Sequence, residues 1–383
     1  MLAHFPAAPK GLPQAKRPEC NGANSQVGQR YWGSETELIT GQHRPSSHAA
    51  KSTTPLAPRP LRRNCRYTCL AIETALLAIQ LPLCPRPSRH SLSTRVEYYT
   101  VITRITAGAL TLRGVSLGGV YTSIFCPELN AVFDVGIAPR SSSAADFIFL
   151  SHGHVDHVGA LSSLLGIRAL VGKKKPPKVF LPQEIEAPIL RALEAMTELQ
   201  RYDLAVDTVA MKAGDLAPMR GDLQVRAFLT HHVVPSLGFS LVRHIKKLKE
   251  EFRGLPGQEI AELKRAGKDL FNVVERTELS YCTDTLIQAL DNNPELYRSR
   301  VLVLECTFLD ERKPIKLARA GCHIHLDEII ERAERFENES LVLMHFSQLY
   351  KPAEVVEILD RRCPPALRAR IVPFVPKSKH WPG

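Results

Sequence analysis

The chain has 383 residues, of which 44% are hydrophobic and 23% charged, so it can bury a substantial core and lacks the composition of a disordered protein. Nine scattered cysteines, odd in number and without a CxxC pair, argue against a disulfide framework and favour reduced thiols in an intracellular protein. The longest apolar run, residues 74–84, is interrupted by Gln80 and Pro82 and is too short to cross a bilayer, so we expect a soluble protein without membrane contact.

Residues 1–96 differ in composition from the rest of the chain. They hold 13 Lys and Arg against four Glu and no Asp, which accounts for +9 of the formal net charge of +11. The basic balance is therefore weak support for nucleic-acid binding by the core. An Arg-rich, hydroxyl-rich and acid-poor leader is typical of an organelle transit peptide, for a plastid or a mitochondrion. A disordered tail and upstream sequence from a misplaced start remain alternatives, with the cytoplasm or nucleus as the compartment.

From residue 97 to 383 we expect one domain with alternating strands and helices. Apolar runs predict strands at Ile102–Val115, Ser123–Phe133, Phe147–Leu150, Val179–Leu181, Leu223–Leu229, Val301–Leu304 and Leu341–Met344. A spacing of three to four residues between apolar side chains predicts helices at Ile185–Leu199, Ile260–Ala266, Leu326–Phe336 and Ala353–Arg361. A Gly-rich turn at Gly118 and Gly119 separates the first two strands. This mixture indicates a layered α/β domain with helices outside the sheets.

The stretch SHGHVDHVGA, residues 151–160, places His152, His154, Asp156 and His157 directly after the strand ending at Leu150. Burying three imidazoles and a carboxylate in one turn is costly unless something neutralises them. All four side chains are metal ligands, so the motif predicts a metal site at the end of this strand.

Further ligand-type residues follow other predicted strands. His231 and His232 follow the strand ending at Leu229, Asp284 follows a short apolar stretch, and His345 follows Met344. A single histidine after a strand is more often a capping or packing residue than a ligand. Several such residues beside the histidine cluster favour one metal centre assembled from distant parts of the chain.

This pattern resembles the metallo-β-lactamase superfamily, and within it the short-form tRNase Z family of the plant type, whose members process tRNA 3′ ends. The similarity runs from about Leu112 to the C-terminus. It rests on the stretches FDVG (133–136), KKKPP (173–177), KKLKEEFRGLPGQEIAELKRAG (246–267), LECTFLD (304–310), CHIHLDEI (322–329) and RFENESLVLMHFS (335–347), and on Tyr350. The resemblance implies a four-layer αβ/βα sandwich with two zinc ions at the edge of its sheets.

The resemblance also implies a ligand set for the two zinc ions. Its members are His152, His154 and His232 for the first ion, Asp156, His157 and His345 for the second, and Asp284 as the carboxylate that bridges both. His232 is preferred to His231 because the family places its ligand directly before an apolar pair, here Val233 and Val234.

By the same resemblance the chain is a zinc-dependent endoribonuclease that removes 3′ trailers from pre-tRNA and forms a homodimer. Two cations about 3.5–4 Å apart lower the pKa of a bridging water and clamp a phosphate during in-line displacement. Asp156 is implied to hold the metal-bound hydroxide for attack. His325, oriented by Glu305, is implied to protonate the departing ribose oxygen.

The family also carries a basic arm that holds tRNA at a distance, and we expect it between the first ligand cluster and His232. In that interval residues 185–202 read as an ordinary amphipathic helix, so the presence of an arm is open. The cations of residues 246–267, with Lys173–Lys175, are either a solvated surface or contacts to tRNA phosphates.

Two positions depart from the family pattern. Thr283 replaces a glycine before the bridging aspartate, which predicts an altered turn, and Leu349 replaces an arginine. Both put substrate preference in doubt. A hydrolase of a small phosphodiester or thioester on the same fold is therefore an alternative. A non-catalytic RNA-binding subunit is a third hypothesis, opposed by the complete ligand set.

Overall fold

The computed structural model describes residues 102–382, so the leader and the expected boundary at residue 96 lie outside the described part. Two seven-stranded sheets form the centre of the described residues. In the first sheet the strands follow chain order: β1 (Thr103–Ala107), β2 (Leu110–Leu117), β3 (Tyr121–Cys126), β4 (Ala131–Phe133), β5 (Phe147–Phe149), β6 (Lys178–Pro182) and β7 (Asp207–Met211). The second holds β8 (Leu216–Arg220), β9 (Leu223–Leu229), β10 (Leu237–Leu248), β11 (Phe271–Cys282), β12 (Val301–Glu305), β13 (Ser340–Met344) and β14 (Ile371–Pro373).

Each sheet is antiparallel in its first half and parallel in its second. Strands β1 to β4 pair antiparallel and β4 to β7 parallel, and the same change of direction occurs at β11 in the second sheet. The carboxyl ends of parallel strands lie at the same edge of a sheet, which is where an α/β protein can gather residues from several loops. The loops after β5, β11, β12 and β13 all carry candidate site residues.

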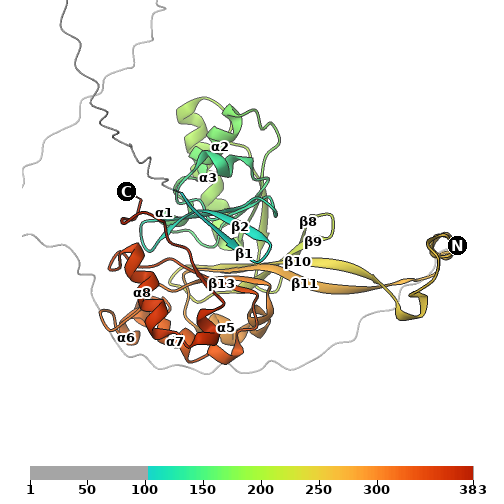
Figure 1. The fold of residues 1–383 in the computed structure, drawn as a ribbon. Coiled ribbons are helices and arrows are strands. Elements are labelled where there is room, and N and C mark those ends of the chain that lie inside the picture. Colours follow the sequence, from blue (N-terminus) through green and yellow to red (C-terminus); the bar gives the residue numbers. More distant parts are fainter. Residues whose placement is uncertain (1–101, 383) are drawn as a thin grey trace, which may run out of the picture. The chain divides into compact units, whose positions relative to one another are not determined.

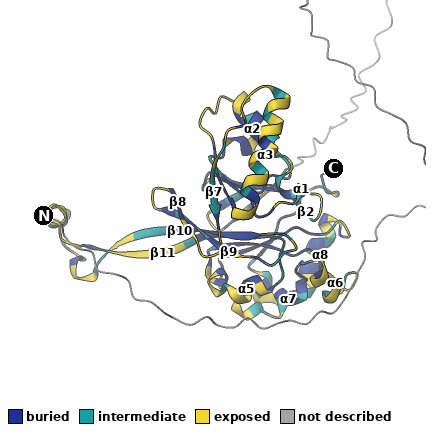
Figure 2. Cartoon of the chain, turned by 180° about the vertical axis from the view of Figure 1, so that it is seen from behind, coloured by how far each residue is buried: buried dark blue, intermediate teal, exposed yellow. Residues whose placement is uncertain are grey.

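Helices cover the outer face of each sheet (Figure 1). On the first sheet these are α2 (Leu161–Leu170) and α3 (Gln183–Gln200). On the second they are α5 (Gln288–Asn292), α7 (Leu326–Ile330), α8 (Pro352–Arg362) and α9 (Pro365–Arg368). A further short helix, α6 (Ile315–Ala320), precedes α7 in the chain. The inner faces enclose an aromatic core of Phe133, Phe149, Phe180, Phe239 and Tyr281, and buried residues line this interface (Figure 2). The predicted four-layer αβ/βα sandwich is confirmed.

Some predicted boundaries were wrong. The single strand expected at Ile102–Val115 is the hairpin β1–β2, which reverses at Gly108 with a φ of +54°. The strand expected at Ser123–Phe133 is likewise β3 and β4. The helix expected at Leu326–Phe336 ends at Ile330 in α7. No helix of the described residues has the length and apolar character needed to cross a membrane.

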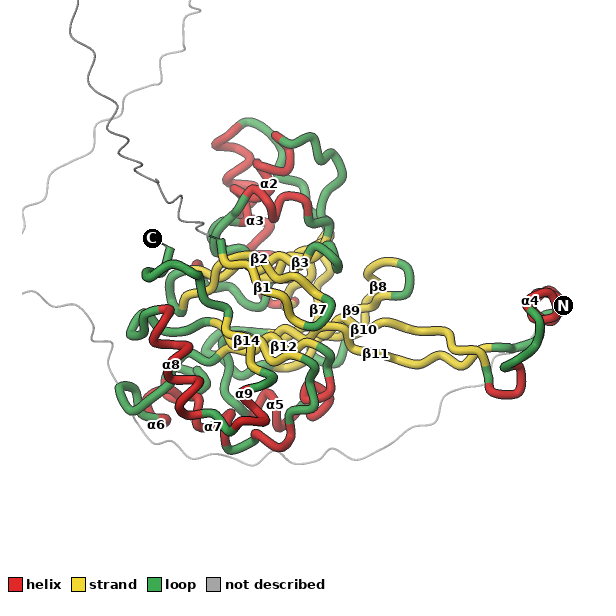
Figure 3. The backbone as a smooth tube through the Cα atoms, in the orientation of Figure 1, coloured by secondary structure: helices red, strands yellow, loops and turns green. Residues whose placement is uncertain are grey.

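A long two-stranded ribbon leaves the second sheet between His232 and Asp284 (Figure 3). We call residues 244–277 the arm. Its strands are the outer parts of β10 and β11, and its tip carries the helix α4 (Gly257–Arg265). The expected position before His232 was therefore wrong: Ile185–Tyr202 is largely α3, which packs on the first sheet. Neither face of the ribbon is covered by a core, so its sequence shows little alternation between apolar and polar residues.

Candidate metal centre

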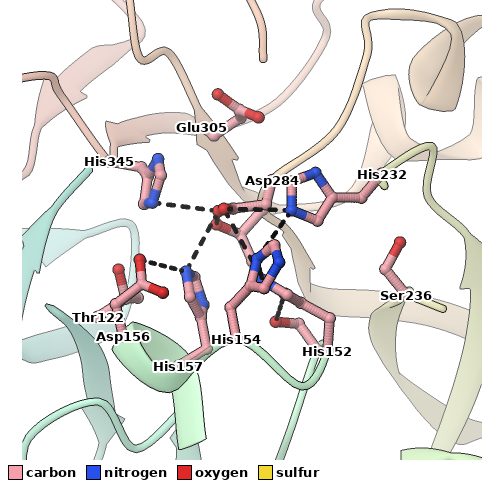
Figure 4. A network of polar contacts seen from close by, with 12 residues as sticks. Thr122, His152, His154, Asp156, His157, His232, Ser236, Asp284, Glu305 and His345 are labelled. Atoms are coloured by element: carbon pink, nitrogen blue, oxygen red, sulfur yellow. Dashed lines mark hydrogen bonds and ion pairs between the residues drawn. The ribbon is translucent and has the colours of Figure 1, made fainter. Parts of the chain in front are cut away.

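The seven predicted ligands come together at one edge of the two sheets (Figure 4). His152 and His154 lie on the loop after β5, and the short helix α1 (Val155–Val158) carries Asp156 and His157. The other three follow β9, β11 and β13. Residues separated by almost 200 positions in the sequence thus form two adjoining groups, in each of which the potential ligand atoms lie within 4.8 Å of one another.

The first group contains three imidazoles. Nδ1 of His154 lies 3.1 Å from Nε2 of His152 and 3.1 Å from Nε2 of His232. Oδ2 of Asp284 lies 3.8 Å from the His152 nitrogen and 3.9 Å from the His232 nitrogen. Three ring nitrogens and a carboxylate oxygen thus converge on one small space.

The second group lies on the other side of Asp284. Oδ1 of Asp284 is 3.4 Å from Nε2 of His157 and 3.2 Å from Nε2 of His345. Oδ2 of Asp156 is 3.5 Å from the same His157 nitrogen. Asp284 therefore presents one carboxylate oxygen to each group, which is the geometry a bridging ligand requires.

The donor set fits divalent metal ions on its own geometry. Among the described residues, Nε2 of His157 and Nε2 of His345 are buried without a hydrogen-bond partner and face Asp284. Buried polar atoms are otherwise almost always paired, so these two nitrogens need a partner that is not a protein group. Asp284 (φ +42°) and His345 (φ +60°) have left-handed backbones, a costly conformation that clusters at functional sites.

Burial and charge set the protonation of these rings in the absence of metal. Burial lowers the pKa of His152 to about 2 and also lowers the pKa values of His232 and His345. Those three rings are therefore neutral at pH 7, as metal ligation requires. His157 differs: burial opposes its charge, but Asp284 and Asp134 raise its pKa well above the usual value. A cation would replace the proton on that ring.

A further residue of the site, Asp134, was not singled out from the sequence. It is fully buried and accepts hydrogen bonds from Nδ1 of His157 (2.8 Å), the Tyr281 hydroxyl (2.6 Å) and the Ser151 amide (2.8 Å). Its contact to Nδ1 leaves Nε2 of His157 free for the site, the usual role of a carboxylate behind a metal-binding histidine. The only sequence signal was its place directly after β4, within FDVG.

Gly136, in the same stretch, explains why the loop after β4 carries a glycine. A Cβ atom at this position would lie 1.8 Å from the carbonyl oxygen of Asp156. The close approach lets the loop of α1 settle against β4, and the Gly136 amide donates to the Thr122 carbonyl at 2.8 Å. Only glycine allows this packing without moving a predicted ligand.

The expected pairing of Glu305 with His325 is not formed. Oε1 of Glu305 lies 3.2 Å from Nδ1 of His323, and the His323 ring stacks on that of His345 with 5.4 Å between the centroids. His325 caps α7 instead: its Nδ1 accepts from the Asp327 amide and its Nε2 donates to the Asp310 carbonyl. His325 is 2% exposed and both its nitrogens are occupied, so it is a structural residue here.

Glu305 is held in place on all sides. It is fully buried and accepts from the Thr285 amide (2.6 Å), the Thr307 hydroxyl (2.5 Å) and the Ile324 amide (3.2 Å). Burial disfavours the charged form of His323, but this carboxylate outweighs it and raises the pKa of His323 to about 9. In the absence of metal the pair is therefore a fixed carboxylate beside a protonated imidazole at the rim of the metal centre.

The two departures from the family pattern leave the site intact. The left-handed residue of the β11 turn is Asp284, not Thr283, so a glycine is not needed at position 283. The Thr283 hydroxyl donates to Oδ1 of Asp284 at 2.8 Å. Near Leu349, the guanidinium of Arg312 stacks on the Tyr350 ring at 4.4 Å and donates to the Leu349 carbonyl at 3.3 Å.

Comparisons with known proteins agree with this geometry. Residues 129–346 match the family model described as Beta-lactamase superfamily domain. The chain is 35% identical over 262 residues to tRNase Z TRZ1 of Arabidopsis thaliana, covering 68% of this chain and 93% of that protein. It is 32% identical over 265 residues to the chloroplastic tRNase Z TRZ2 of the same plant, covering 69% of this chain and 74% of that protein.

Among solved structures, the short form of human tRNase Z aligns with a TM-score of 0.42 at 18% identity, covering 65% of this chain and 93% of that one. The match to the family model spans more than half of the chain, and the plant relatives exceed 30% identity over most of their own length. The chain belongs to the tRNase Z family of the beta-lactamase superfamily.

Proposed function

We propose that the protein is a zinc-dependent endoribonuclease that cuts pre-tRNA after the discriminator nucleotide and removes the 3′ trailer. The observation that carries the proposal is the joint presence of the seven-ligand centre and the arm. The relatives are named tRNase Z, and the arm would give a small hydrolytic site a second point of contact with a large substrate. The arm holds eight Lys and Arg against six Asp and Glu, a modest excess that favours contact with phosphates.

Two zinc ions are the proposed cofactors, held by His152, His154, His232, Asp156, His157, His345 and Asp284. Such a pair generates a nucleophile from water at neutral pH and neutralises charge on a phosphate. Asp284 would position both halves of the site because its two oxygens face different ligand groups. Asp156, whose side chain is 18% exposed, would orient the attacking water toward phosphorus.

The departing 3′ oxygen of the tRNA needs a proton, and we propose that His323 delivers it. His323 lies beside the ligands His345 and His232, with ring centroids 5.4 Å and 5.8 Å away. Glu305 accepts from Nδ1, which leaves Nε2 to face the substrate. Thr307 fixes the geometry further, since its hydroxyl contacts Glu305 and lies 3.0 Å from Nδ1 of His345.

The homodimer that the family implies is proposed to form through α3. The large apolar side chains of Leu190, Met196 and Leu199 on this helix, and of Tyr202 just after it, are exposed, and Leu199 is 76% exposed. An apolar surface of this kind commonly marks a protein interface. Light scattering of the wild type should give twice the chain mass, and Leu199→Glu should give the single-chain mass.

For residues 1–96 we propose a transit peptide, with residues 97–383 as the hydrolase domain and a plastid or mitochondrion as the compartment. The basic leader composition and the chloroplastic name of one relative support this. Fusing residues 1–96 to a fluorescent reporter and incubating it with isolated chloroplasts and mitochondria tests it. Protease-protected reporter in neither organelle contradicts the proposal.

The activity test uses the full chain purified with its metal. A 3′-extended pre-tRNA and bis(p-nitrophenyl) phosphate serve as substrates for the wild type, for Asp156→Ala and for Asp203→Asn, a control at an exposed carboxylate. Cleavage after the discriminator, lost in Asp156→Ala and retained in the control, is the expected result. Turnover of the small ester alone would favour the alternative hydrolase, and no turnover of either by metal-loaded protein would favour the non-catalytic subunit.

A further inference from the structure

The root of the arm is the place where a two-stranded ribbon leaves a seven-stranded sheet. Strand β10 pairs with β9 only up to Arg243, and β11 pairs with β12 only from Leu279 onward. Beyond these residues β10 and β11 pair only with each other, and the ribbon projects away from both sheets (Figure 1). The direction of the arm therefore depends on the few residues at its root.

The root of the arm contains a β-bulge. Leu241 pairs with Leu279 and Val242 pairs with Thr277, so Glu278 is an extra residue on β11 without a partner on β10. A bulge bends its strand and increases the local twist, and bulges commonly redirect a strand. Glu278 thus lies at the position where β11 changes from a sheet strand to an arm strand.

The side chain of Glu278 binds three arginines. Oε1 accepts from Nε of Arg243 at 2.8 Å and from the Arg276 guanidinium at 2.7 Å, and Oε2 accepts from Arg300 at 2.9 Å. The Glu278 side chain is only 5% exposed, whereas the three arginines are 28–46% exposed. A buried carboxylate with three charge-assisted hydrogen bonds is fixed in one orientation.

The arginines extend this contact across the sheet. Arg243 also donates to both oxygens of Asp222, in the turn between β8 and β9, at 2.7 Å and 2.9 Å. Arg300, just before β12, also donates to both oxygens of Glu339, just before β13, at 2.7 Å and 2.9 Å. The bulge is thereby tied to neighbouring strands on both sides, in a cluster with three positive and three negative charges.

We propose that Glu278 is a positioning residue that sets the direction and rigidity of the arm, and thereby the affinity for a substrate that must reach both the arm and the metal centre. The substrate part of this inference rests on the proposed function. A small phosphodiester contacts only the metal centre, so its turnover does not depend on the arm. Glu278 would then determine specificity for long substrates without touching the reacting atoms.

The test compares Glu278→Gln with Glu331→Gln in the full chain. Gln keeps the size of the side chain but removes the charge that binds three guanidinium groups. Glu331 is the control, because it lies outside the arm and makes an exposed ion pair with Arg332 at 3.6 Å. Misplacing a substrate-binding element can lower the rate of the reaction by about 10- to 100-fold. We expect KM for pre-tRNA to rise by about 10-fold in Glu278→Gln, with kcat/KM for the small ester unchanged.

A second measurement is independent of tRNA. Dyes on non-natural residues at the exposed positions 259, on the arm tip, and 357, on α8, report the distance between arm and body. The distance distribution should be broader or shifted in Glu278→Gln and unchanged in Glu331→Gln. Glu278→Asp, which keeps the charge on a shorter side chain, should restore part of the wild-type distribution.

If Glu278→Gln fails to fold, Arg243→Lys serves in its place, because it keeps the charge but cannot bridge Glu278 and Asp222. A wild-type distance distribution in the variant that folds, together with an unchanged KM for pre-tRNA, overturns the proposal. Failure of the wild-type protein to cut pre-tRNA refutes the proposed function alone, since the dye distances still decide whether Glu278 orients the arm.

Discussion

The Glu305 carboxylate lies 3.2 Å from Nδ1 of His323, while His325, two residues further on, turns its ring toward the backbone of Asp310 and Asp327. The two histidines flank one buried isoleucine and differ completely in surroundings. His323 shares the metal centre with His345, and His325 forms the N-cap of α7. The neighbouring imidazoles thus have separate surroundings, and we propose separate roles for them, one chemical and one structural.

This division predicts opposite results for two substitutions. A general acid typically contributes about 10²- to 10⁴-fold, so His323→Gln should lower kcat for pre-tRNA by that amount. It should affect bis(p-nitrophenyl) phosphate much less, because p-nitrophenolate leaves without a proton. His325→Asn, which retains an N-cap side chain, should change kcat by less than about threefold. An equal loss on both substrates in His323→Gln would argue against proton donation.

Replacing Asp134 should lower the affinity of the centre for zinc. Replacing a carboxylate behind a metal-binding histidine typically costs about 10- to 100-fold in metal affinity or activity, and we expect this for Asp134→Asn. Competition with a chromophoric chelator measures it directly. Asp146→Asn is the control, since that carboxylate is 45% exposed. Wild-type zinc affinity in Asp134→Asn would show that His157 is oriented by other contacts.

The two glycines around the histidine motif should differ in their tolerance of alanine. At Gly136 a Cβ would lie 1.8 Å from the Asp156 carbonyl, so Gly136→Ala must displace α1 and should reduce zinc content and turnover. At Gly153 the nearest atom is a methyl group of Ile185 at 3.6 Å, an ordinary contact, so Gly153→Ala should retain both. Zinc content by atomic emission and a crystal structure of each variant check this.

Removing the metal should lower thermal stability. A ligand present at about 1,000 times its Kd stabilises the folded state by about 4 kcal/mol. Without metal, the centre also holds several buried imidazoles and carboxylates close together with no cation between them. Dialysis against a chelator should lower the Tm, and added zinc should restore it. Asp284→Asn should reduce this zinc-dependent shift, because both ligand groups lose their shared carboxylate. An unchanged Tm after demonstrated zinc removal would contradict the assignment of the centre.

Glu278 also predicts a dependence of stability on pH. Burial raises the pKa of this carboxyl, but Arg276, Arg300 and Arg243 outweigh burial and hold it below the usual 4.5. Its stabilisation is therefore present above pH 4.5 and is lost as the pH falls through the lowered pKa. At pH 7, Glu278→Gln should cost about 1–3 kcal/mol of unfolding free energy, and the difference from wild type should shrink below pH 4. Denaturant unfolding at both pH values measures it.

The sequence alone determined much of the metal centre and the class of fold. His152, His154, Asp156 and His157 are contiguous, so their shared role follows from local spacing alone. His231, His232, Asp284 and His345 were candidates because each follows a strand, and strand ends meet at one edge of an α/β sandwich. The family resemblance selected His232 over His231. The strand Val301–Glu305 is buried at every position and apolar in its first four residues, which made it easy to predict.

Tertiary structure decided what depends on contacts across the chain. His323 and His325 have the same type and nearly the same place in the sequence, and only the packing of α7 selects the one that faces Glu305. Asp134 has no neighbouring site residue in the sequence. Its hydrogen-bond partners Tyr281 and His157 lie 147 and 23 residues away along the chain, and only the fold brings them into contact with it. The arm could not be located from its pattern, because a ribbon exposed on both faces has no core to impose alternation. We propose that its direction depends on a bulge and an ion cluster joining five separate strands and loops, which no local spacing encodes.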